Sequence, residues 1–399
     1  MSDHERQTDD GSGRPEASSP PDGGGHPDGH GSGASAYGSG GAGDGAGYPT
    51  GRDYDESPLI VTWEVTQACS LSCDHCRADA VESRHPGELT TAEGRGLIAQ
   101  VARFDPTPVL VLSGGDPLQR PDLFELIEYA TDRVPTAVTP APTERLDRET
   151  VDRFADLGVR RMALSLDGAT AGSHDAFRGE PGSFERVRRA AAWADDVGLD
   201  VQVNTTVTAE TADELPAVAE RVADLGAVMW EVFFLVPVGR GTALDGLSPA
   251  RAESVLAWLY EHAQSAPYRT ITVEAPHYRR VASERSDGEA RVGSTRAGQG
   301  FVFVSHTGEV YPSGFLPVSV GDVRERPLPT TYREADLMRA LRDADRFSGP
   351  CGRCPYRRRC GGSRSRAYAT TGDPLASDPL CSLVDGTDDE RSGPTTTEP

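Results

Sequence analysis

"LIVTWEVTQACSLSCDHC", residues 59–76, begins as a run of β-branched and aromatic residues and ends in three cysteines. Such a run is typical of a β-strand, and Cys69, Cys73 and Cys76 follow it in the spacing C-x3-C-x2-C. An iron–sulfur cube and a tetrahedral zinc site both need four ligands, but the next cysteine is Cys351. The three thiols favour a cubane cluster with one iron left open, because zinc usually uses C-x2-C pairs. A zinc site with a distant fourth ligand is the alternative.

Five more strand-like runs follow, and amphipathic stretches separate them. Six strand–helix repeats predict parallel strands joined by right-handed crossovers, and therefore an α/β protein. A sheet of this kind binds ligands at the carboxyl ends of its strands. The further runs are at residues 109–114, 136–141, 160–168, 200–208 and 229–237, and the amphipathic stretches are at 90–104, 121–132, 147–158, 182–198 and 211–226.

The composition excludes some classes of function. The 399 residues carry a formal charge of -22, which argues against non-specific nucleic-acid binding. All 40 basic residues are arginine, and the acidic, lysine-free composition resembles that of salt-adapted proteins from GC-rich genomes. No run reaches the roughly 18 apolar residues of a membrane span, and "MSDHERQTDD" is no secretory signal. We therefore expect a cytoplasmic protein whose seven cysteines are reduced and bind metal.

A second candidate loop, "SGGDP", Ser113 to Pro117, follows the second strand-like run. Gly114 and Gly115 would let the backbone approach a ligand closely, and the carboxylate of Asp116 suits an ammonium group. A tight turn with an N-cap aspartate is the alternative. Because this loop and the cysteine loop follow neighbouring strands, we expect them on the same rim of the sheet.

Four more cysteines lie near the C-terminus, in the spacing C-x2-C-x5-C-x20-C. Four thiols saturate a cubane cluster and leave no iron for a substrate. A structural zinc ribbon is the alternative, since C-x2-C pairs are also zinc spacing. The four are Cys351, Cys354, Cys360 and Cys381.

The cysteine loop and "SGGDP" together resemble the radical S-adenosylmethionine (SAM) superfamily, although Asp116 stands where Glu is commoner. The resemblance implies a partial (β/α)6 TIM-like barrel, a 4Fe–4S cluster on the first three cysteines, and SAM on the open iron. Residues 114–117 would then receive the amino group of SAM, and His75 would lie near its adenine. The remaining candidates, for ribose and carboxylate, are Ser165, Asp167 and Arg178, with Asn204 and Thr206 as weaker ones.

Two readings stay open in the later loops. The segment that holds Asp167 and Arg178 is alternatively a capped loop before a helix that starts at Gly182. Arg240, in "LVPVGRG", is either a surface turn residue or a substrate anchor.

The C-terminal cysteines resemble the SPASM extension of radical SAM maturases, whose full pattern has seven cysteines. Ser313 in "TGEVYPSG" and Ser363 in "CGGSR" stand where cysteines commonly occur. The resemblance therefore implies one auxiliary 4Fe–4S cluster, and two clusters in the whole chain. The predicted domains are a disordered tail (1–56), the barrel (57–245), a helical linker (246–298), the auxiliary domain (299–383) and an acidic disordered tail (384–399).

Three segments, 63–80, 301–318 and 361–381, resemble the radical SAM enzymes of alternative heme biosynthesis and heme d1 formation. The implied reaction begins with reductive cleavage of SAM to a 5'-deoxyadenosyl radical. That radical would take hydrogen from a propionate of Fe-coproporphyrin III, carbon dioxide would leave, and the auxiliary cluster would take one electron. A small donor such as ferredoxin or flavodoxin would reduce the first cluster. Arginine is the expected clamp for the carboxylates. Most of the arginines around the auxiliary site are expected to be solvated or paired with acids instead, and these are Arg357, Arg358, Arg359, Arg364 and Arg366.

Two other classes compete with a heme enzyme. A maturase of ribosomal peptides shares the SPASM extension, and would have a short precursor peptide as its partner. A non-enzymatic electron-transfer protein is the second, but it would have no need of the "SGGDP" turn.

Overall fold

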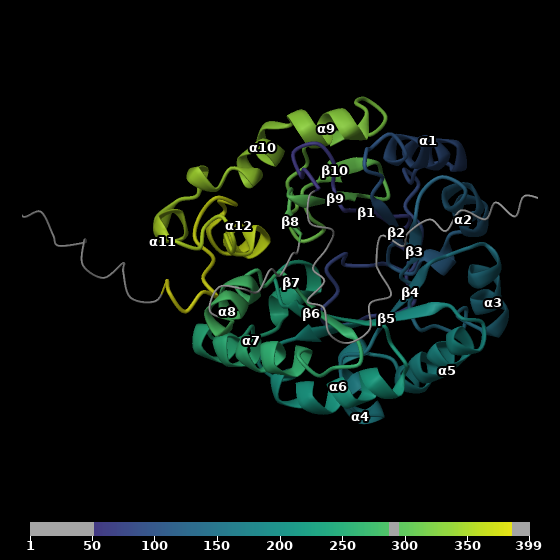
Figure 1. Ribbon diagram of the computed structural model, residues 1–399. Coiled ribbons are helices and arrows are strands. Elements are labelled where there is room, and N and C mark those ends of the chain that lie inside the picture. The colour runs from purple at the N-terminus through teal and green to yellow at the C-terminus, as the bar shows by residue number, and fades with distance from the viewer. Residues whose placement is uncertain (1–51, 287–294, 385–399) are drawn as a thin grey trace, which may run out of the picture. The chain divides into compact units, whose positions relative to one another are not determined.

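The computed structural model describes residues 52–286 and 295–384. The two predicted disordered tails lie almost entirely outside these residues. Within them, one sheet contains eleven strands, and Figure 1 shows it curving inside a layer of helices.

Seven parallel strands form the main part of the sheet, in the order of the chain. The first six coincide with the six predicted runs, which confirms the α/β prediction. The seventh lies in the segment predicted to be a helical linker and continues the sheet beyond β6. The strands are β1 (Ile60–Glu64), β2 (Val109–Ser113), β3 (Thr136–Val138), β4 (Arg161–Ser165), β5 (Asp200–Val207), β6 (Met229–Phe234) and β7 (Arg269–Val273).

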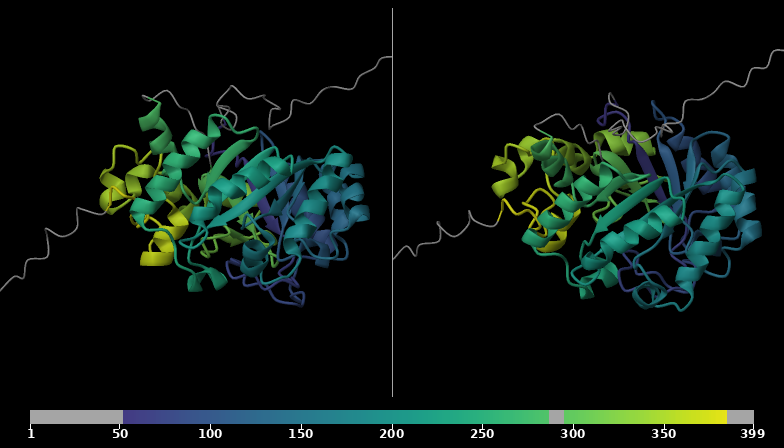
Figure 2. Two further views of the ribbon diagram at one scale, coloured as in Figure 1. Left: turned by 90° about the horizontal axis from the view of Figure 1, so that it is seen from below. Right: turned by 60° about the horizontal axis from the view of Figure 1, so that its bottom comes forward.

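Helices join these strands and cover the outer face of the sheet (Figure 2). Trp63 on β1 packs against Gly94 of the first helix, where a Cβ would lie 2.6 Å from the indole ring. Thr90 begins this helix with a capping box that it shares with Glu93. The helices are α1 (Thr91–Val101), α2 (Leu123–Thr131), α3 (Arg148–Asp156), α4 (Ala171–Arg178), α5 (Ser183–Asp196), α6 (Leu215–Asp224), α7 (Pro249–Ala263) and α8 (Tyr278–Arg285).

Helix α4 was not predicted, because its segment was expected to be a loop before the helix at Gly182. Thr170 and Ser173 form a capping box at its start, and Gly179, with φ 65°, ends it. The helix buries His174 and Arg178, so it packs through polar residues that carry no apolar periodicity.

The C-terminal segment shares the barrel's sheet. Strand β9 pairs in parallel with β1, with Ile60 opposite Phe301, and β10 and β11 extend this edge in antiparallel fashion. The first and the last third of the chain are thereby joined side by side. The elements are β8 (Arg296–Ala297), β9 (Gly300–Val304), β10 (Glu309–Tyr311), β11 (Gly321–Asp322), α9 (Leu328–Glu334), α10 (Asp336–Arg342), α11 (Gly349–Arg353) and α12 (Arg364–Thr371).

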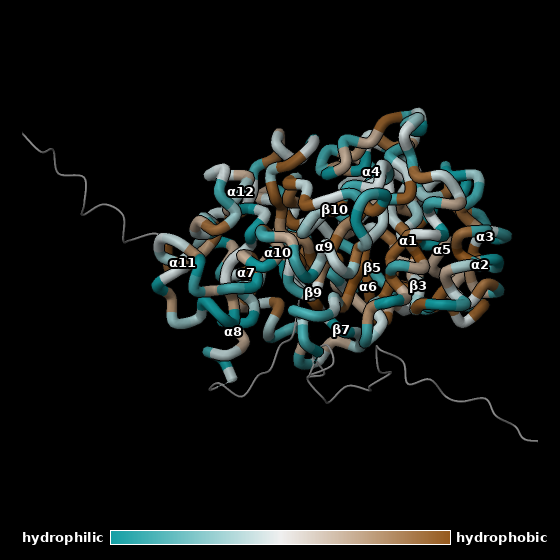
Figure 3. The backbone as a smooth tube through the Cα atoms, turned by 90° about the horizontal axis from the view of Figure 1, so that it is seen from above, coloured by the Kyte–Doolittle hydropathy of each residue, from teal (hydrophilic) through white to brown (hydrophobic). Residues whose placement is uncertain are grey.

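One apolar core fills the space between the sheet and its helices. Fully buried side chains such as Trp63, Leu112 and Trp230 belong to it. In Figure 3 many hydrophobic segments run through the interior, and hydrophilic segments dominate the periphery. The core fixes the strand ends, and the candidate residues lie at those ends.

Candidate active site

The first three cysteines lie together in the loop after β1. Cys69 and Cys73 are 7% exposed and pack in one small cluster with Leu71, with Cys76 at its edge. Burial raises the pKa of Cys69 to about 11, and the neighbouring thiols and Asp116 add to this shift. Bare thiolates are therefore disfavoured here, whereas a bound cluster supplies the positive charge that stabilises them. The donor set and its burial fit an iron–sulfur cluster.

Arg240 holds this loop from the other side of the barrel. Its Nε donates to the carbonyl oxygen of Cys73 at 2.9 Å, and its backbone N–H donates to that of Cys76 at 3.1 Å. Gly239 adopts φ 55°, and a Cβ there would lie 2.5 Å from the Cys76 oxygen. Arg240 is therefore a clamp on the cysteine loop and more than a surface turn residue, and its role as a substrate anchor stays a prediction.

The two glycines of "SGGDP" allow contact with the cysteine loop. A Cβ on Gly114 would lie 2.5 Å from the oxygen of Thr66, and one on Gly115 would lie 2.5 Å from that of Ala68. The N–H of Asp116 donates to the same Ala68 oxygen at 2.7 Å. The two glycines thus let this loop pass close to the cysteine loop, and their close approach to a ligand stays a prediction.

Asp116 is fully buried and acts as the predicted alternative, an N-cap. Its carboxylate accepts hydrogen bonds from the N–H of Leu118 (3.2 Å), the N–H of Ala141 (3.3 Å) and the hydroxyl of Thr143 (3.0 Å). Pro117 starts the short 3-10 helix Pro117–Gln119 that Asp116 caps. The carboxylate thus ties together the loops after β2 and β3.

The structure brings His75, Asp167 and Arg178 together. Arg178 contacts Asp167 Oδ2 at 3.4 Å and His75 Nε2 at 3.3 Å, and the N–H of Thr206 donates to Asp167 Oδ1 at 2.7 Å. Ser165 ends β4, opposite Asn204 on β5. These residues therefore lie at the carboxyl ends of neighbouring strands, beside the cysteine loop.

Helix α4 supplies the partner that sequence reasoning missed. The ring of Phe177 stacks on His75, with centroids 4.6 Å apart and planes 9° apart. Burial lowers the pKa of His75 to about 4, so the imidazole is neutral near pH 7. One face of it is covered by Phe177, and an aromatic ligand would use the other.

The four C-terminal cysteines line one pocket of about 200 Å³. Around it, the N–H of Gly362 points at Cys360 Sγ (3.5 Å), and buried Arg364 points at Cys351 Sγ (3.9 Å). Burial raises the pKa of the Cys360 thiol to about 12. Among the described residues, no three His, Cys, Asp or Glu side chains are placed to bind one metal ion. Four thiols around one pocket suit a metal centre, and both the cluster and the zinc reading stay predictions.

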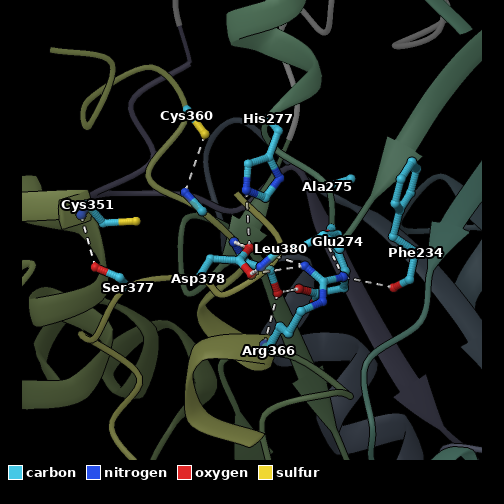
Figure 4. Close-up of polar contacts among 12 residues, drawn as sticks. Phe234, Glu274, Ala275, His277, Cys351, Cys360, Arg366, Ser377, Asp378 and Leu380 are labelled. Carbon is cyan, nitrogen blue, oxygen red and sulfur yellow. Dashed lines mark hydrogen bonds and ion pairs between the residues drawn. The ribbon is translucent and has the colours of Figure 1, made fainter. Parts of the chain in front are cut away.

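A buried polar network supports this pocket, and Figure 4 shows its members. Asp378 accepts hydrogen bonds from the N–H of Ser363 (2.6 Å) and from Arg366 (3.1 Å), and His277 lies 3.4 Å away. Arg366 also donates to the carbonyl oxygens of Phe234 and Glu274. The network joins the ends of β6 and β7 to the cysteine segment.

The two serines at expected cysteine positions share one partner. The hydroxyls of Ser313 (3.2 Å), Ser365 (2.9 Å) and Ser363 all donate to the carboxylate of Glu274. Glu274 has φ 54°, an uncommon conformation for this residue. A hydrogen-bonded carboxylate therefore occupies the space between these two positions.

The five arginines around the auxiliary site already have partners. Arg357 and Arg358 pair with Asp345, and Arg359 donates to Ser283. Arg364 donates to backbone carbonyls, and Arg366 belongs to the Asp378 network. Each of the five thus has a partner, and three of them pair with acids, as expected for most of this set.

Within the described residues, no helix combines the length and the apolar character needed to cross a membrane.

Comparisons with known proteins agree with this geometry. A family model described as the radical SAM superfamily matches residues 63–222. The AdoMet-dependent heme synthase of Methanosarcina barkeri is 40% identical over 82% of this chain and 96% of its own. The AdoMet-dependent heme synthase of Nitratidesulfovibrio vulgaris is 38% identical over 82% of this chain and 94% of its own. Mycofactocin maturase MftC of Mycobacterium tuberculosis is 30% identical over 82% of this chain and 83% of its own.

Solved structures share the fold. Native anSMEcpe with bound AdoMet superposes with a TM-score of 0.65 and 17% identity, over 82% of this chain and 94% of that one. SuiB of Streptococcus suis superposes with a TM-score of 0.65 and 16% identity, over 82% of this chain and 77% of that one. The superfamily implies an enzyme with a 4Fe–4S cluster and SAM as its cofactors. The chain belongs to the radical SAM superfamily, in the family that contains the AdoMet-dependent heme synthases.

Proposed function

We propose that the protein decarboxylates propionate side chains of Fe-coproporphyrin III to vinyl groups, as a step of heme biosynthesis. The observation that carries this proposal is the 40% identity to a heme synthase over 96% of that relative. The 337 aligned residues are more than the barrel segment holds, so the similarity extends beyond the barrel.

Cys69, Cys73 and Cys76 would hold the first 4Fe–4S cluster, and SAM would bind its open iron. With both bound, reductive cleavage of SAM supplies the 5'-deoxyadenosyl radical. The face of His75 opposite Phe177 would lie against the adenine. Arg178 is near enough to Cys73 for their charges to interact, and its guanidinium suits the carboxylate of SAM. Asp116 and Arg240 would hold the loops around it in place.

The decarboxylation has to dispose of one electron. Loss of a hydrogen atom from the propionate, followed by departure of carbon dioxide, forms the vinyl double bond only if one electron leaves. Cys351, Cys354, Cys360 and Cys381 would hold a second 4Fe–4S cluster without an open iron, which suits it to accept that electron. A small donor such as ferredoxin or flavodoxin would reduce the first cluster, in the cytoplasm, where thiols stay reduced.

The test is anaerobic incubation of the reconstituted protein with SAM, dithionite and Fe-coproporphyrin III, followed by mass spectrometry. We expect 5'-deoxyadenosine and a porphyrin that has lost carbon dioxide and two hydrogens at each of two propionates. A protein with both clusters that cleaves SAM but leaves this porphyrin unchanged would disprove the proposal.

A peptide maturase is the second candidate, because MftC is 30% identical over 82% of this chain. Porphyrin-independent modification of a short precursor peptide encoded beside the gene would favour it.

A further inference from the structure

A carboxylate–histidine pair lies at the mouth of the barrel, beside the cysteine loop. Glu64 ends β1, and its Oε1 is 2.7 Å from Nδ1 of His306, in the turn between β9 and β10. Its Oε2 accepts a hydrogen bond from Arg77 at 3.1 Å. Arg77 directly follows Cys76, so the pair is joined to the first cluster site through one residue.

The pair sets the tautomer of His306. Burial by itself would raise the pKa of Glu64, but the hydrogen bond from His306 and the charge of Arg77 outweigh it, and the pKa lies below its usual value. Glu64 is therefore ionised near neutral pH and can only accept hydrogen bonds. The proton of a neutral His306 is then on Nδ1, and Nε2 carries a lone pair.

Nε2 of His306 has no hydrogen-bond partner among the described residues, while its ring stays 13% exposed. The backbone of His306 is held, since its carbonyl oxygen accepts from the N–H of Leu89 at 2.8 Å. A histidine whose Nδ1 is oriented by a carboxylate and whose Nε2 is free is the usual arrangement of a metal ligand.

The surroundings indicate which metal this ligand serves. No three potential ligands converge on one ion anywhere in the described segments, so a bare ion would be held poorly. An iron porphyrin brings four nitrogens of its own and needs only an axial donor from the protein. Arg77, which contacts Glu64, lies over the ring of Phe303 on β9 at 4.5 Å, and Tyr311 on β10 is 6.2 Å from Phe303, so this edge of the site is partly aromatic.

We propose that His306 Nε2 is the axial ligand of the iron in an iron porphyrin substrate, and that Glu64 is the positioning residue that holds Nδ1 and so directs Nε2 toward the iron. This inference rests on the proposed function. It explains how the substrate is placed beside the cysteine loop without a free arginine clamp among residues 357–366.

The experiment is an anaerobic titration of the reconstituted protein with ferric Fe-coproporphyrin III, read by Soret absorption and EPR. The wild type should give a histidine-ligated spectrum. His306→Ala should lose that spectrum and bind the iron porphyrin at least about tenfold more weakly, and added imidazole should restore the spectrum. Glu64→Gln should weaken binding about tenfold while it keeps the axial nitrogen.

Three controls make the result specific. Metal-free coproporphyrin III should bind wild type and His306→Ala equally, because it has no iron to ligate. His262→Ala, on α7 away from this mouth, should titrate as wild type does. His85 lies edge-on to His306 with ring centroids 5.3 Å apart, so His85→Ala tests the neighbouring imidazole and should keep the ligated spectrum.

The outcomes separate this inference from the proposed function. A His306→Ala variant with an unchanged spectrum and unchanged decarboxylation would overturn the axial-ligand assignment alone. Loss of the histidine signature in His85→Ala but not in His306→Ala would overturn it too. A wild type that neither binds nor converts the iron porphyrin would reject the proposed function, and the assignment with it.

Discussion

Arg240 Nε donates a hydrogen bond to the carbonyl oxygen of Cys73 at 2.9 Å, so the loop after β6 holds the loop after β1. These two loops are the first and last of the six predicted repeats, and a second bond, from Arg240 to the oxygen of Ala80 at 3.1 Å, reinforces the contact. The cysteine loop contains no helix or strand of its own between Thr66 and Ala80. Its geometry therefore depends on clamps from other loops.

We predict that Arg240→Met lowers the iron retained by the first cluster and slows SAM cleavage, because the carbonyl groups of Cys73 and Ala80 lose their donor. Removing a charged donor from such groups costs about 1–3 kcal/mol. Iron content and the EPR signal of the reduced cluster measure the effect. Arg251→Met is the matched control, since Arg251 is an exposed arginine paired only with Asp213, and it should retain iron as wild type does.

Anaerobic reconstitution should give about eight irons and eight sulfides per chain, from two cubane clusters. The hydroxyls of Ser313 and Ser363 point at Glu274, so these positions offer no thiolates for a third cluster. About four irons with one zinc would show that the auxiliary site is a zinc site. About twelve irons would show that a further cluster forms in spite of the serines.

Cys381→Ala should uncouple the two halves of the reaction. A four-thiolate cluster has no open iron, so an electron-accepting role predicts continued formation of 5'-deoxyadenosine with much less decarboxylated porphyrin. The measurement is the ratio of product to 5'-deoxyadenosine in a folded variant. An unchanged ratio argues against electron transfer, and joint loss of solubility and both activities indicates a structural cluster.

Glu231, on β6, should make stability depend on pH. Burial raises its pKa to about 7 from an ordinary value of 4.5, against the opposing charges of Arg161 and Arg269. Between these two pKa values the folded state binds a proton that the unfolded state has released. The contribution of Glu231 to the free energy of unfolding is therefore complete below pH 4.5 and is lost as the pH rises through 7.

Glu231→Gln is the comparison that isolates this group, since it keeps the shape and removes the titration. The free energy of unfolding of wild type relative to this variant should fall by about 1 kcal/mol between pH 6 and pH 8. A constant difference would show that Glu231 is ionised throughout this range, and a difference that grows with pH would equally contradict a raised pKa.

Local signals explain what could be predicted of the fold. Each of the six strands is an apolar run long enough to recognise alone, and the cysteines are few and closely spaced. Strand β7, "RTITV", has only two apolar residues, Ile271 and Val273, and lies between two helices, so the segment was predicted to be helical. The pairing of Ile60 with Phe301 joins segments that no local pattern connects.

The residues of the candidate site likewise fall into those that a local sequence signal reveals and those that only the folded structure reveals. Cys69, His75 and Asp167 follow recognisable strands, and the structure brings them together. Glu274 and Asp378 matter through contacts made only after folding, and each is one carboxylate among 62 acidic residues in the sequence. Arg240 was noticed, but its partners are backbone carbonyls, which carry no sequence signal.

The most direct test of the central claim is isotope transfer from Fe-coproporphyrin III that is deuterated on its propionate carbons. Mass spectrometry of the 5'-deoxyadenosine formed in the first turnover should show one added deuterium in the wild type, together with the vinyl product. If the 5'-deoxyadenosine carries no deuterium while SAM is cleaved, the radical does not act on the propionates, and the account is contradicted.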